Sequence, residues 1–381
     1  MVIAINTISI FEENKSDYFF HEIFTRLIAE HTSHSFVLIA KNEISEWQHF
    51  QNMVHANPGE LPKSKLLAQI AFPIKLKKIC KKHKADVLIH TQPFKLKTDL
   101  PQILFRPDVN FLINPEYCDK KVLSFMKKNA VEIFSNAASI IVASEFEKVI
   151  LKKLHADFEQ KTHVIYEGIN SKGTTLETEE RERIKEKFAE GNEYFIYPGT
   201  ISPLKNLVNL LKAFSAFKKR QRSGMQLMIA GGKGKGFDEF LHSVDLYKFK
   251  KEVKILTDLS AEKNQKIIAA AYATILPAAN EIAATAALQS MQCDVPVIGC
   301  SVGAIPEICG DAGSYFAPGD YKNITDKMML IFKDEKLRSE MIAKGRKNSE
   351  KHNWGQSVQS TWKIISENHS EKQKGPHHLR L

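Results

Sequence analysis

The stretch YFIYPGTISPLKNLVNLLKAF, residues 194–214, shows how this chain is built. A short apolar run is followed by a Gly-Thr turn, a Pro-Leu-Lys-Asn loop and a segment whose apolar residues recur at helical spacing. One face of the expected helix holds Leu207, Leu210, Leu211, Phe214 and Phe217. Because a buried strand, a loop and an amphipathic helix form the repeating unit of α/β proteins, the stretch predicts a parallel sheet covered by helices.

The same unit recurs along the whole chain. In the first half the runs that predict strands are VIAINTIS, SFVLIA, DVLIH, QILF, SIIVAS and THVIYEG; in the second half they are YFIYPG, QLMIAGG, EVKIL, TILPA and PVIGC. These runs are continuously apolar, as expected for parallel strands with helices on both faces. Two successive blocks predict two doubly wound, Rossmann-like sheets that face a cleft, with ligands bound beyond the carboxyl ends of the strands.

The length and a change of composition predict two domains. A chain of 381 residues is longer than most single domains, and the segment at 168–193 is polar and charged. We therefore expect one Rossmann-like domain over residues 1–170 and a second over residues 171–354. The polar tail at 373–381 is expected to be flexible.

Composition narrows the class of protein. Hydrophobic residues make up 43% of the chain and charged residues 26%, values typical of a globular protein. The five cysteines are widely spread and form no CxxC pair, so neither a disulfide framework nor a zinc site is indicated, and a cytoplasmic location is expected. The first ten residues, MVIAINTISI, predict a buried strand, and no apolar run approaches the roughly 18 residues of a transmembrane helix.

The formal net charge of +10 is concentrated in part of the first half. The stretch from Lys63 to Lys97 contains ten lysines and a single acidic residue, Asp86. A solvated helix face is the plainest explanation, and a surface for an anionic membrane, a lipid phosphate or an acidic glycan is the alternative. Four apolar residues form a stripe beside the lysines: Leu66, Leu67, Ile70 and Ile74. Nucleic acid is not expected as a partner, because few aromatic residues interleave with these lysines.

Several catalytic motifs are absent from the sequence. The stretch GGKGKG, residues 231–236, matches neither the P-loop nor the GxGxxG pattern, and a turn that lets a ligand approach Gly231 and Gly232 is expected instead. The chain has no GxSxG elbow, no HExxH and no DxD pair. The missing DxD pair argues against a sugar transferase that holds a diphosphate through a divalent metal. No metal and no other cofactor is therefore expected.

Two junctions between a loop and a helix have features of a ligand site. Lys205 lies just before a helix, beside backbone N–H groups that have no partner within that helix, and this combination suits a phosphate. Glu281 precedes a second helix whose first residues are mostly small. Each junction also has an ordinary explanation, because lysines are common at loop ends and an alanine-rich helix packs closely on a sheet. Only their combination predicts a function.

In order and spacing, several segments resemble the group-4 glycosyltransferases, the large retaining family with the GT-B fold. The resemblance in the second half rests on YPGTISPLKNLVNLLKAF, LMIAGG and ATILPAANEIAATAALQSMQCDVPVIGCSVGAIPEICGDAGSYFAPGD. In the first half, PEYCDKKVLSFMKKNAVEIFSNAASIIVASEFEKVILKKL and THVIYEGIN are similar to the family's N-terminal domain. HNWGQSVQSTWKII is similar to its closing helix. That helix, at about 355–372, is expected to return to the first domain.

The resemblance implies metal-independent transfer of a sugar from a nucleotide-diphosphate sugar held mainly by the second domain. Lys205 matches the lysine that contacts the diphosphate, and Glu281 matches the glutamate near the sugar, the first of an E-x7-E motif. Gln289 stands where the second glutamate binds the ribose. The expected donor-binding residues are Gly199, Thr200, Lys205, Asn206, Gly231, Gly232, Ala283, Ala284, Thr285 and Gln289. The expected catalytic residues are Glu281 and Asp108, and the residues expected to line the cleft from the first domain are Ser144 and Glu145.

Four departures from the family pattern affect this prediction. SIFEENKSDYF, residues 9–19, replaces a glycine-rich loop. Pro107 replaces the histidine of a His-Asp pair and leaves Asp108. IAA at 282–284 replaces GFG and so removes backbone freedom. Gln289 replaces a carboxylate, which weakens ribose binding by on the order of 1 kcal/mol because a neutral hydrogen bond contributes less than a charge-assisted one.

The sequence therefore predicts a glycosyltransferase of polysaccharide biosynthesis that moves a sugar to a glycan or lipid-linked acceptor. It is expected in the cytoplasm or peripherally at the inner face of the membrane. The alternative is a catalytically impaired GT-B protein that binds nucleotide or sugar as a partner subunit in glycan assembly, and the four departures favour it. A sugar-nucleotide epimerase of the same fold is a third alternative, although the Lys-Asn loop and the glutamate motif favour group 4.

Overall fold

The computed structural model describes residues 1–8, 18–62, 64–169 and 175–373. The chain divides into two compact units: unit 1 is Met1–Gly168 with Trp354–Leu381, and unit 2 is Ile169–Asn353. Two features of the sequence, Glu12 and Glu13 of the altered loop and the tail from residue 374, lie outside the described residues. No helix within the described ranges combines the length and the apolar character needed to cross a bilayer.

Unit 1 is built on a seven-stranded sheet of order β3-β2-β1-β4-β5-β6-β7. Every neighbouring pair of strands is parallel, as the continuous apolar runs predicted. The strands are β1 (Val2–Asn6), β2 (Ser35–Ile39), β3 (Met53–Ala56), β4 (Val87–His90), β5 (Gln102–Phe105), β6 (Ser139–Val142) and β7 (Thr162–Val164). β3 was not predicted, because this edge strand is only partly buried and has no continuous apolar run.

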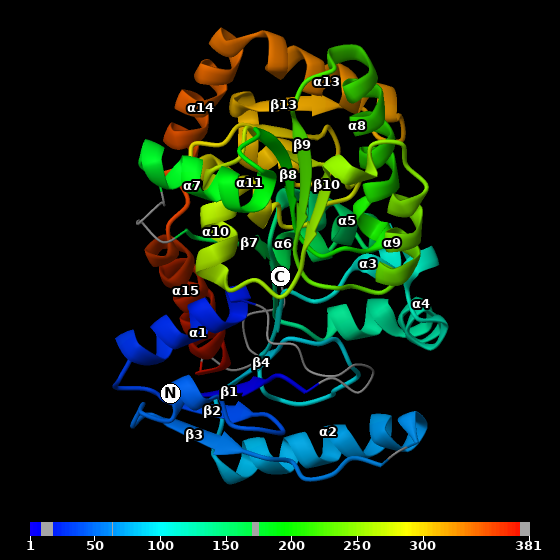
Figure 1. Ribbon diagram of the computed structural model, residues 1–381. Coiled ribbons are helices and arrows are strands. Elements are labelled where there is room, and N and C mark those ends of the chain that lie inside the picture. Colours follow the sequence, from blue (N-terminus) through cyan, green and yellow to red (C-terminus); the bar gives the residue numbers. More distant parts are fainter. Residues whose placement is uncertain (9–17, 63, 170–174, 374–381) are drawn as a thin grey trace. The chain divides into compact units, whose positions relative to one another are not determined.

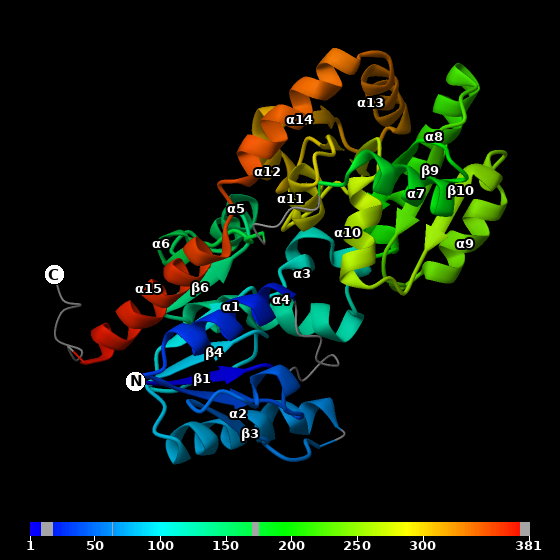
Figure 2. The ribbon, with the colours of Figure 1, turned by 60° about the vertical axis from the view of Figure 1, so that its left-hand side comes forward.

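Helices cover both faces of the first sheet (Figures 1 and 2). One face is covered by α1 (Tyr18–Glu30) and α15 (Trp354–Gln373), whose apolar side chains pack with Ile3 and Ile5 of β1. The other face is covered by α2 (Lys65–Lys82), which packs against Ala4. This alternation follows from the two-residue period of a strand. The remaining helices of the unit are α3 (Asn110–Ile113), α4 (Lys120–Ser135), α5 (Glu145–Leu154) and α6 (Phe158–Lys161).

Unit 2 is built on a six-stranded parallel sheet of order β10-β9-β8-β11-β12-β13. The strands are β8 (Tyr194–Pro198), β9 (Gln226–Ala230), β10 (Val253–Leu256), β11 (Ala273–Leu276), β12 (Val297–Cys300) and β13 (Gly313–Phe316). The helices are α7 (Thr178–Ala189), α8 (Leu207–Gln221), α9 (Phe237–Asp245), α10 (Ala261–Ala269), α11 (Thr285–Gln292), α12 (Ile305–Cys309), α13 (Tyr321–Lys333) and α14 (Glu335–Ser349). The sequence analysis also missed β13, a second edge strand with mostly half-buried residues.

The stretch at 194–214 folds as its pattern predicted. It forms β8, a short 3-10 helix at Pro203–Lys205 and the first half of α8. The five apolar positions expected on one face of the helix are all buried, which confirms that face as the inner one. The loop between β8 and α8 therefore lies at the carboxyl end of a central strand, where doubly wound sheets bind ligands.

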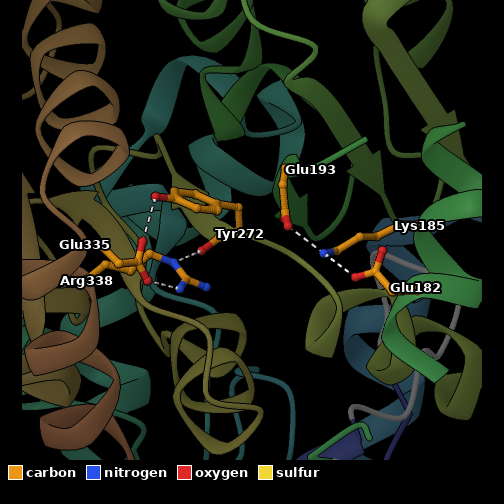
Figure 3. A network of polar contacts seen from close by, with 6 residues as sticks. All are labelled: Glu182, Lys185, Glu193, Tyr272, Glu335 and Arg338. Carbon is orange, nitrogen blue, oxygen red and sulfur yellow. Dashed lines mark hydrogen bonds and ion pairs between the residues drawn. The ribbon is translucent and has the colours of Figure 1, made fainter. Parts of the chain in front are cut away.

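The amino ends of β8 and β11 hold a separate polar network (Figure 3). Lys185 of α7 contacts Glu182 and also Glu193, the residue just before β8. Arg338 of α14 donates to the backbone oxygen of Tyr272, the residue just before β11, at 3.2 Å. These contacts fix two helices to the end of the sheet that is opposite to the ligand-binding edge.

Candidate functional site

A cavity of about 370 Å³ opens in unit 2 at the carboxyl ends of β8, β9 and β11. The last residues of these strands, Pro198, Ala230 and Leu276, all line it. The other lining residues are Tyr197, Gly199, Thr200, Lys205, Gly231, Gly232, Asn264, Glu281, Ala284, Thr285, Ala286 and Gln289. Eight of the ten expected donor-binding residues, and the expected catalytic Glu281, thus surround one cavity.

Lys205 and Glu281 form an ion pair in this cavity. The Lys205 ammonium donates to both carboxylate oxygens of Glu281, at 2.6 and 2.8 Å. The two side chains are 26% and 22% exposed, so the pair is accessible but partly shielded from water. The sequence analysis gave these residues separate roles, toward a diphosphate and a sugar. Because of this direct contact, a phosphate bound at Lys205 would compete with Glu281 for the same ammonium group.

The backbone of Glu281 is held by the loop that follows β12. The Ala304 N–H donates to the Glu281 carbonyl at 2.7 Å. A Cβ on Gly303 would lie 2.7 Å from that carbonyl oxygen and 2.9 Å from the Glu281 nitrogen, and Gly303 has a φ of +90°. Only glycine fits both restraints. Gly303 was not predicted as a positioning residue, because its only signal in the sequence is a glycine in the turn after a predicted strand.

The loop of Lys205 is fixed by Asn206. Asn206 has a φ of +56° and donates through its side-chain amide to the Pro277 carbonyl, just after β11, at 3.0 Å. Its side-chain oxygen accepts a hydrogen bond from Asn209 at 2.9 Å. Asn206 was expected among the donor-binding residues, but it does not line the cavity, and its side chain holds the lysine loop to the neighbouring strand.

Close packing of the β8 and β9 loops explains one of the lining glycines. The Gly199 N–H donates to the Ala230 carbonyl at 2.8 Å. A Cβ on Gly231 would lie 2.0 Å from the Gly199 carbonyl oxygen, so no larger residue fits there. A Cβ on Gly232 would meet nothing within 4 Å. The first glycine is therefore required by backbone contact, whereas the second leaves open space beside the cavity.

The start of α11 forms one wall of the cavity. Ala284 precedes the helix with a φ of +42° and is buried, and its side chain provides no cap for the helix amides. An alanine in this left-handed conformation costs roughly 1–2 kcal/mol relative to the usual one. Thr285 and Gln289 are one turn apart and both line the cavity. Ala283, another expected donor-binding residue, does not line it.

Six lining residues were not predicted from the sequence, and two of them, Tyr197 and Asn264, have polar side chains. Tyr197, near the end of β8, donates its hydroxyl to the Thr200 carbonyl at 2.9 Å. Burial raises the pKa of this hydroxyl above its ordinary value, and the Glu281 carboxylate raises it further, so Tyr197 stays protonated at neutral pH. Asn264 of α10 has a buried side-chain oxygen without a hydrogen-bond partner in the described part of the chain. A strand tyrosine and a helix asparagine have no distinctive sequence signal.

The residues expected to line the cleft from unit 1 lie at carboxyl ends of its strands. Asp108 follows β5 and accepts a hydrogen bond from the Asn110 N–H at 2.8 Å. Ser144 follows β6, is fully buried and caps α5 by accepting from the Glu147 N–H at 3.2 Å. Glu145 is the first residue of that helix. Capping accounts for Ser144, and the roles of all three residues toward a substrate stay predictions.

Metal ligands are not gathered in the described residues. No group of three or more His, Cys, Asp or Glu side chains within them has the geometry to hold a metal ion. His31 and His34, which are close in sequence, lie beside Trp362, with 3.5 Å between the His31 and Trp362 ring centroids. Burial lowers the pKa of both histidines.

The comparisons with known proteins agree with this geometry. The family of glycosyl transferases group 1 matches residues 178–348, which form most of unit 2 and include the whole cavity. The O-antigen chain mannosyltransferase B of Escherichia coli is 24% identical over 248 residues. That match covers 65% of this chain and 65% of the mannosyltransferase, slightly less than two thirds of each.

Two solved structures share the fold over nearly the whole chain. The Anabaena protein HepE in complex with UDP and glucose matches with a TM-score of 0.72 and 14% identity, covering 96% of this chain and 100% of that one. Sucrose-phosphate synthase from Thermosynechococcus elongatus matches with a TM-score of 0.75 and 15% identity, covering 96% and 98%. Both sheets are therefore those of the GT-B fold. The chain therefore has the GT-B fold, and its second unit, over residues 178–348, matches the group 1 glycosyl transferases.

Proposed function

We propose that this protein transfers a sugar from a nucleotide-diphosphate sugar to a glycan or a lipid-linked acceptor, with retention and without a metal. The observation behind the proposal is the cavity of unit 2, which brings Lys205, Glu281 and the start of α11 together at the carboxyl edge of the sheet. This is the edge at which doubly wound sheets bind nucleotides. HepE, which shares the fold, has been solved with UDP and glucose bound.

Each polar residue of the cavity has a different role in the proposed transfer. Lys205 and the first amides of α11 stabilise the charge that develops on the departing diphosphate. Glu281, released from Lys205 as the phosphate binds, orients the sugar. Gln289 hydrogen-bonds the ribose hydroxyls, and Asn264 offers a further acceptor to the nucleotide. No step needs a divalent cation, because a lysine and helix-end amides supply the positive potential.

The acceptor and the location extend the proposal. The mannosyltransferase relative is named for the O-antigen chain, and a polymer of that kind favours a glycan or lipid-linked acceptor here. We place the protein in the cytoplasm, peripherally bound to the inner face of the membrane through α2. Leu67, Ile70 and Ile74 are 56%, 60% and 64% exposed on that helix, beside its lysines. An apolar stripe flanked by lysines suits the surface of an anionic bilayer.

Sedimentation with vesicles tests the membrane contact. We expect the protein to sediment with vesicles that contain an anionic lipid at low salt and to be released at high salt, because salt screens the attraction. Equal binding to neutral vesicles would contradict an electrostatic contact.

A second candidate function is a nucleotide- or sugar-binding subunit that no longer transfers. The strained Ala284, which stands where the family has a glycine, and the ion pair that engages both Lys205 and Glu281 favour it. The two functions share the binding step and differ in turnover. A screen of nucleoside diphosphates and their sugars for binding, followed by a transfer assay on each hit, separates them.

Replacement of Lys205 by alanine tests the binding step. The substitution removes a charge-assisted contact, so affinity for the nucleoside diphosphate found in the screen should fall about ten- to a hundredfold. Affinity for the bare nucleoside should not change, because it has no phosphate. Lys212→Ala is the matched control, since Lys212 is exposed on α8 and does not line the cavity. Titration calorimetry that shows equal diphosphate affinity for Lys205→Ala and the parent would remove the phosphate role, and with it the proposed donor site.

A further inference from the structure

Unit 1 contains a second and larger cavity, of about 710 Å³, that the proposed transfer does not use. It is lined by the C-terminal part of α2, by Ala85 just before β4, by Gln102 at the start of β5 and by Asn136 just after α4. These positions are at the amino ends of the strands. The cavity therefore lies at the edge of the sheet opposite to the one where doubly wound folds bind their substrates.

The wall of this cavity is strongly basic. Four lysines line it, against a single carboxylate, Asp99; the lysines are Lys77, Lys81, Lys84 and Lys97. None of the four forms an ion pair with another described residue, whereas the nearby Lys95, which does not line the cavity, pairs with Glu132 at 2.6 Å. Unpaired lysines from two separate segments raise the local positive potential and attract an anion.

Helix stability accounts for only part of this charge. Lysines in the last turn of a helix interact favourably with its dipole, which explains Lys81. Lys84 lies beyond the helix with a φ of +54°, at a position where glycine is usual, and a lysine there costs roughly 1–2 kcal/mol. Lys97 comes from the loop before β5 and has no helix terminus to stabilise. The placement of these last two residues favours a ligand.

The floor of the cavity is apolar and uncharged. Cys80, Leu88 and Leu96 are buried there. Burial raises the pKa of the Cys80 thiol to about 11, so it adds no negative charge at neutral pH. The side-chain nitrogen of Asn136 is buried and has no acceptor within the described residues. The four lysines are themselves exposed to water and act as surface charges, and the Asn136 amide is a buried donor that an anionic oxygen can satisfy.

We propose that this cavity binds a phosphate group. The lysines would attract its negative charge, and the side-chain amide of Asn136 would donate a hydrogen bond to one of its oxygens. The site is separate from the donor cavity of unit 2 and does not depend on the transfer reaction. Two sources have the same chemistry: a soluble phosphate compound, or the headgroup of an anionic lipid. The lipid source would make the cavity a specific anchor beside the exposed face of α2.

The test compares two pairs of charge reversals in the full chain. Lys77→Glu with Lys97→Glu changes the cavity wall. Lys127→Glu with Lys128→Glu changes net charge by the same amount at exposed positions of α4 that do not line the cavity and are not part of the proposed membrane contact of α2. Inorganic pyrophosphate, measured by titration calorimetry, is the soluble probe. Phosphatidylcholine vesicles with and without phosphatidic acid, measured by sedimentation, are the lipid probe.

We expect the cavity pair to weaken binding of the effective probe at least about tenfold and the control pair to weaken it less than about threefold. Saturable binding of pyrophosphate that persists in Lys205→Ala and is weakened by the cavity pair identifies a soluble source. Binding only to phosphatidic acid vesicles identifies the lipid. Equal losses in the two pairs, or no binding of either probe to the parent at low salt, would overturn the proposal. If the cavity pair lowers the melting temperature, Lys77→Gln with Lys97→Gln replaces it, because this pair removes the positive charges without adding negative ones. The same fold-changes in probe affinity then test the proposal.

Discussion

Two lysine–glutamate clusters lie at opposite edges of the same sheet in unit 2. At the carboxyl edge, Lys205 contacts both oxygens of one carboxylate, that of Glu281, 76 residues away in sequence. At the amino edge, Lys185 contacts Glu182 at 2.9 Å and Glu193 at 2.5 Å, three and eight residues away (Figure 3). Both lysines thus meet two carboxylate oxygens, but Lys205 lines the 370 Å³ cavity of unit 2 and Lys185 does not.

The difference indicates which cluster is structural. Lys185 is only 7% exposed, and its partners join a helix to the strand that follows it, so the contact stabilises a local connection. The neighbouring Arg338 does the same for α14, since it stacks on the Tyr272 ring at 4.4 Å and pairs with Glu335 at 2.9 Å. The Lys205 pair joins two distant loops and is open to a competitor. Ion-pair geometry alone therefore does not distinguish a candidate functional site from a structural contact. The distinction comes from whether the lysine is accessible from a cavity and whether its partner is distant in sequence.

The largest effect should come from Glu281→Gln. A group that orients the sugar acts mainly in the transition state, so the substitution should lower kcat about a hundredfold while donor affinity falls much less. Glu193→Gln, at the amino edge, should leave both values unchanged. Steady-state kinetics with a donor identified by screening measures the change in kcat separately from the change in KM. If kcat stays unchanged and donor affinity falls as much as kcat/KM, Glu281 stabilises the bound donor and the transition state equally. That result would contradict a role in orienting the sugar.

The reverse pattern is expected for Lys185→Ala. The glutamate partners are about half exposed, so each ion pair contributes less than about 1 kcal/mol, and loss of the buried lysine stem adds to this. The free energy of unfolding should fall by about 1–2 kcal/mol with donor affinity unchanged. Lys205→Ala should instead lower donor affinity and leave the free energy of unfolding unchanged. Denaturant unfolding and calorimetry on both variants test the contrast, and a Lys185→Ala protein that folds stably but binds donor weakly would abolish it.

The sequence predicted the central strands of both sheets because burial on both faces requires continuous apolar runs. β3 and β13, both edge strands, were missed because MVHA and GSYF are not continuous apolar runs, whereas the edge strands β7 and β10 lie in THVIYEG and EVKIL, which predicted them. The residue types around the cavity of unit 2 were also predictable, because the loops that follow parallel strands meet at one edge. Residues such as Asn206, whose side chain turned out to hold a loop, could not be separated from lining residues by pattern alone.

Contacts between distant loops were beyond prediction from the sequence. The pairing of Lys205 with Glu281 depends on how two loops fold back over the sheet, and no local pattern encodes that distance. Gly303 is required because of backbone that comes from Glu281. Ala284 shows a related limit: the sequence indicated lost backbone freedom at 282–284, and the structure shows that the alanine still adopts the left-handed conformation.

A smaller effect on stability should distinguish Ala284 from its neighbour Ala286. Glycine relieves the left-handed strain at Ala284 but loses a buried methyl group and adds freedom to the unfolded chain, so Ala284→Gly should change stability by less than about 0.5 kcal/mol. Ala286 is in the helix, and Ala286→Gly should cost about 1 kcal/mol. Thermal unfolding of the two variants side by side measures the difference. An Ala284→Gly variant as unstable as Ala286→Gly would show that the positive φ carries no strain.

An effect of about 1 kcal/mol on affinity is expected at Gln289, and it tests the ribose assignment. A carboxylate accepts from two ribose hydroxyls, where the amide offers one acceptor oxygen, so Gln289→Glu should strengthen nucleoside binding by about 1 kcal/mol, roughly fivefold. The nucleoside diphosphate should gain by a similar factor, because both ligands contain the ribose. A 2′,3′-dideoxynucleoside should gain nothing, since it lacks the hydroxyls. Calorimetry on the three ligands separates the outcomes: a gain that persists with the dideoxynucleoside would place the carboxylate on another part of the nucleoside, and a loss confined to the diphosphate would place it beside the phosphates, next to the Lys205–Glu281 pair.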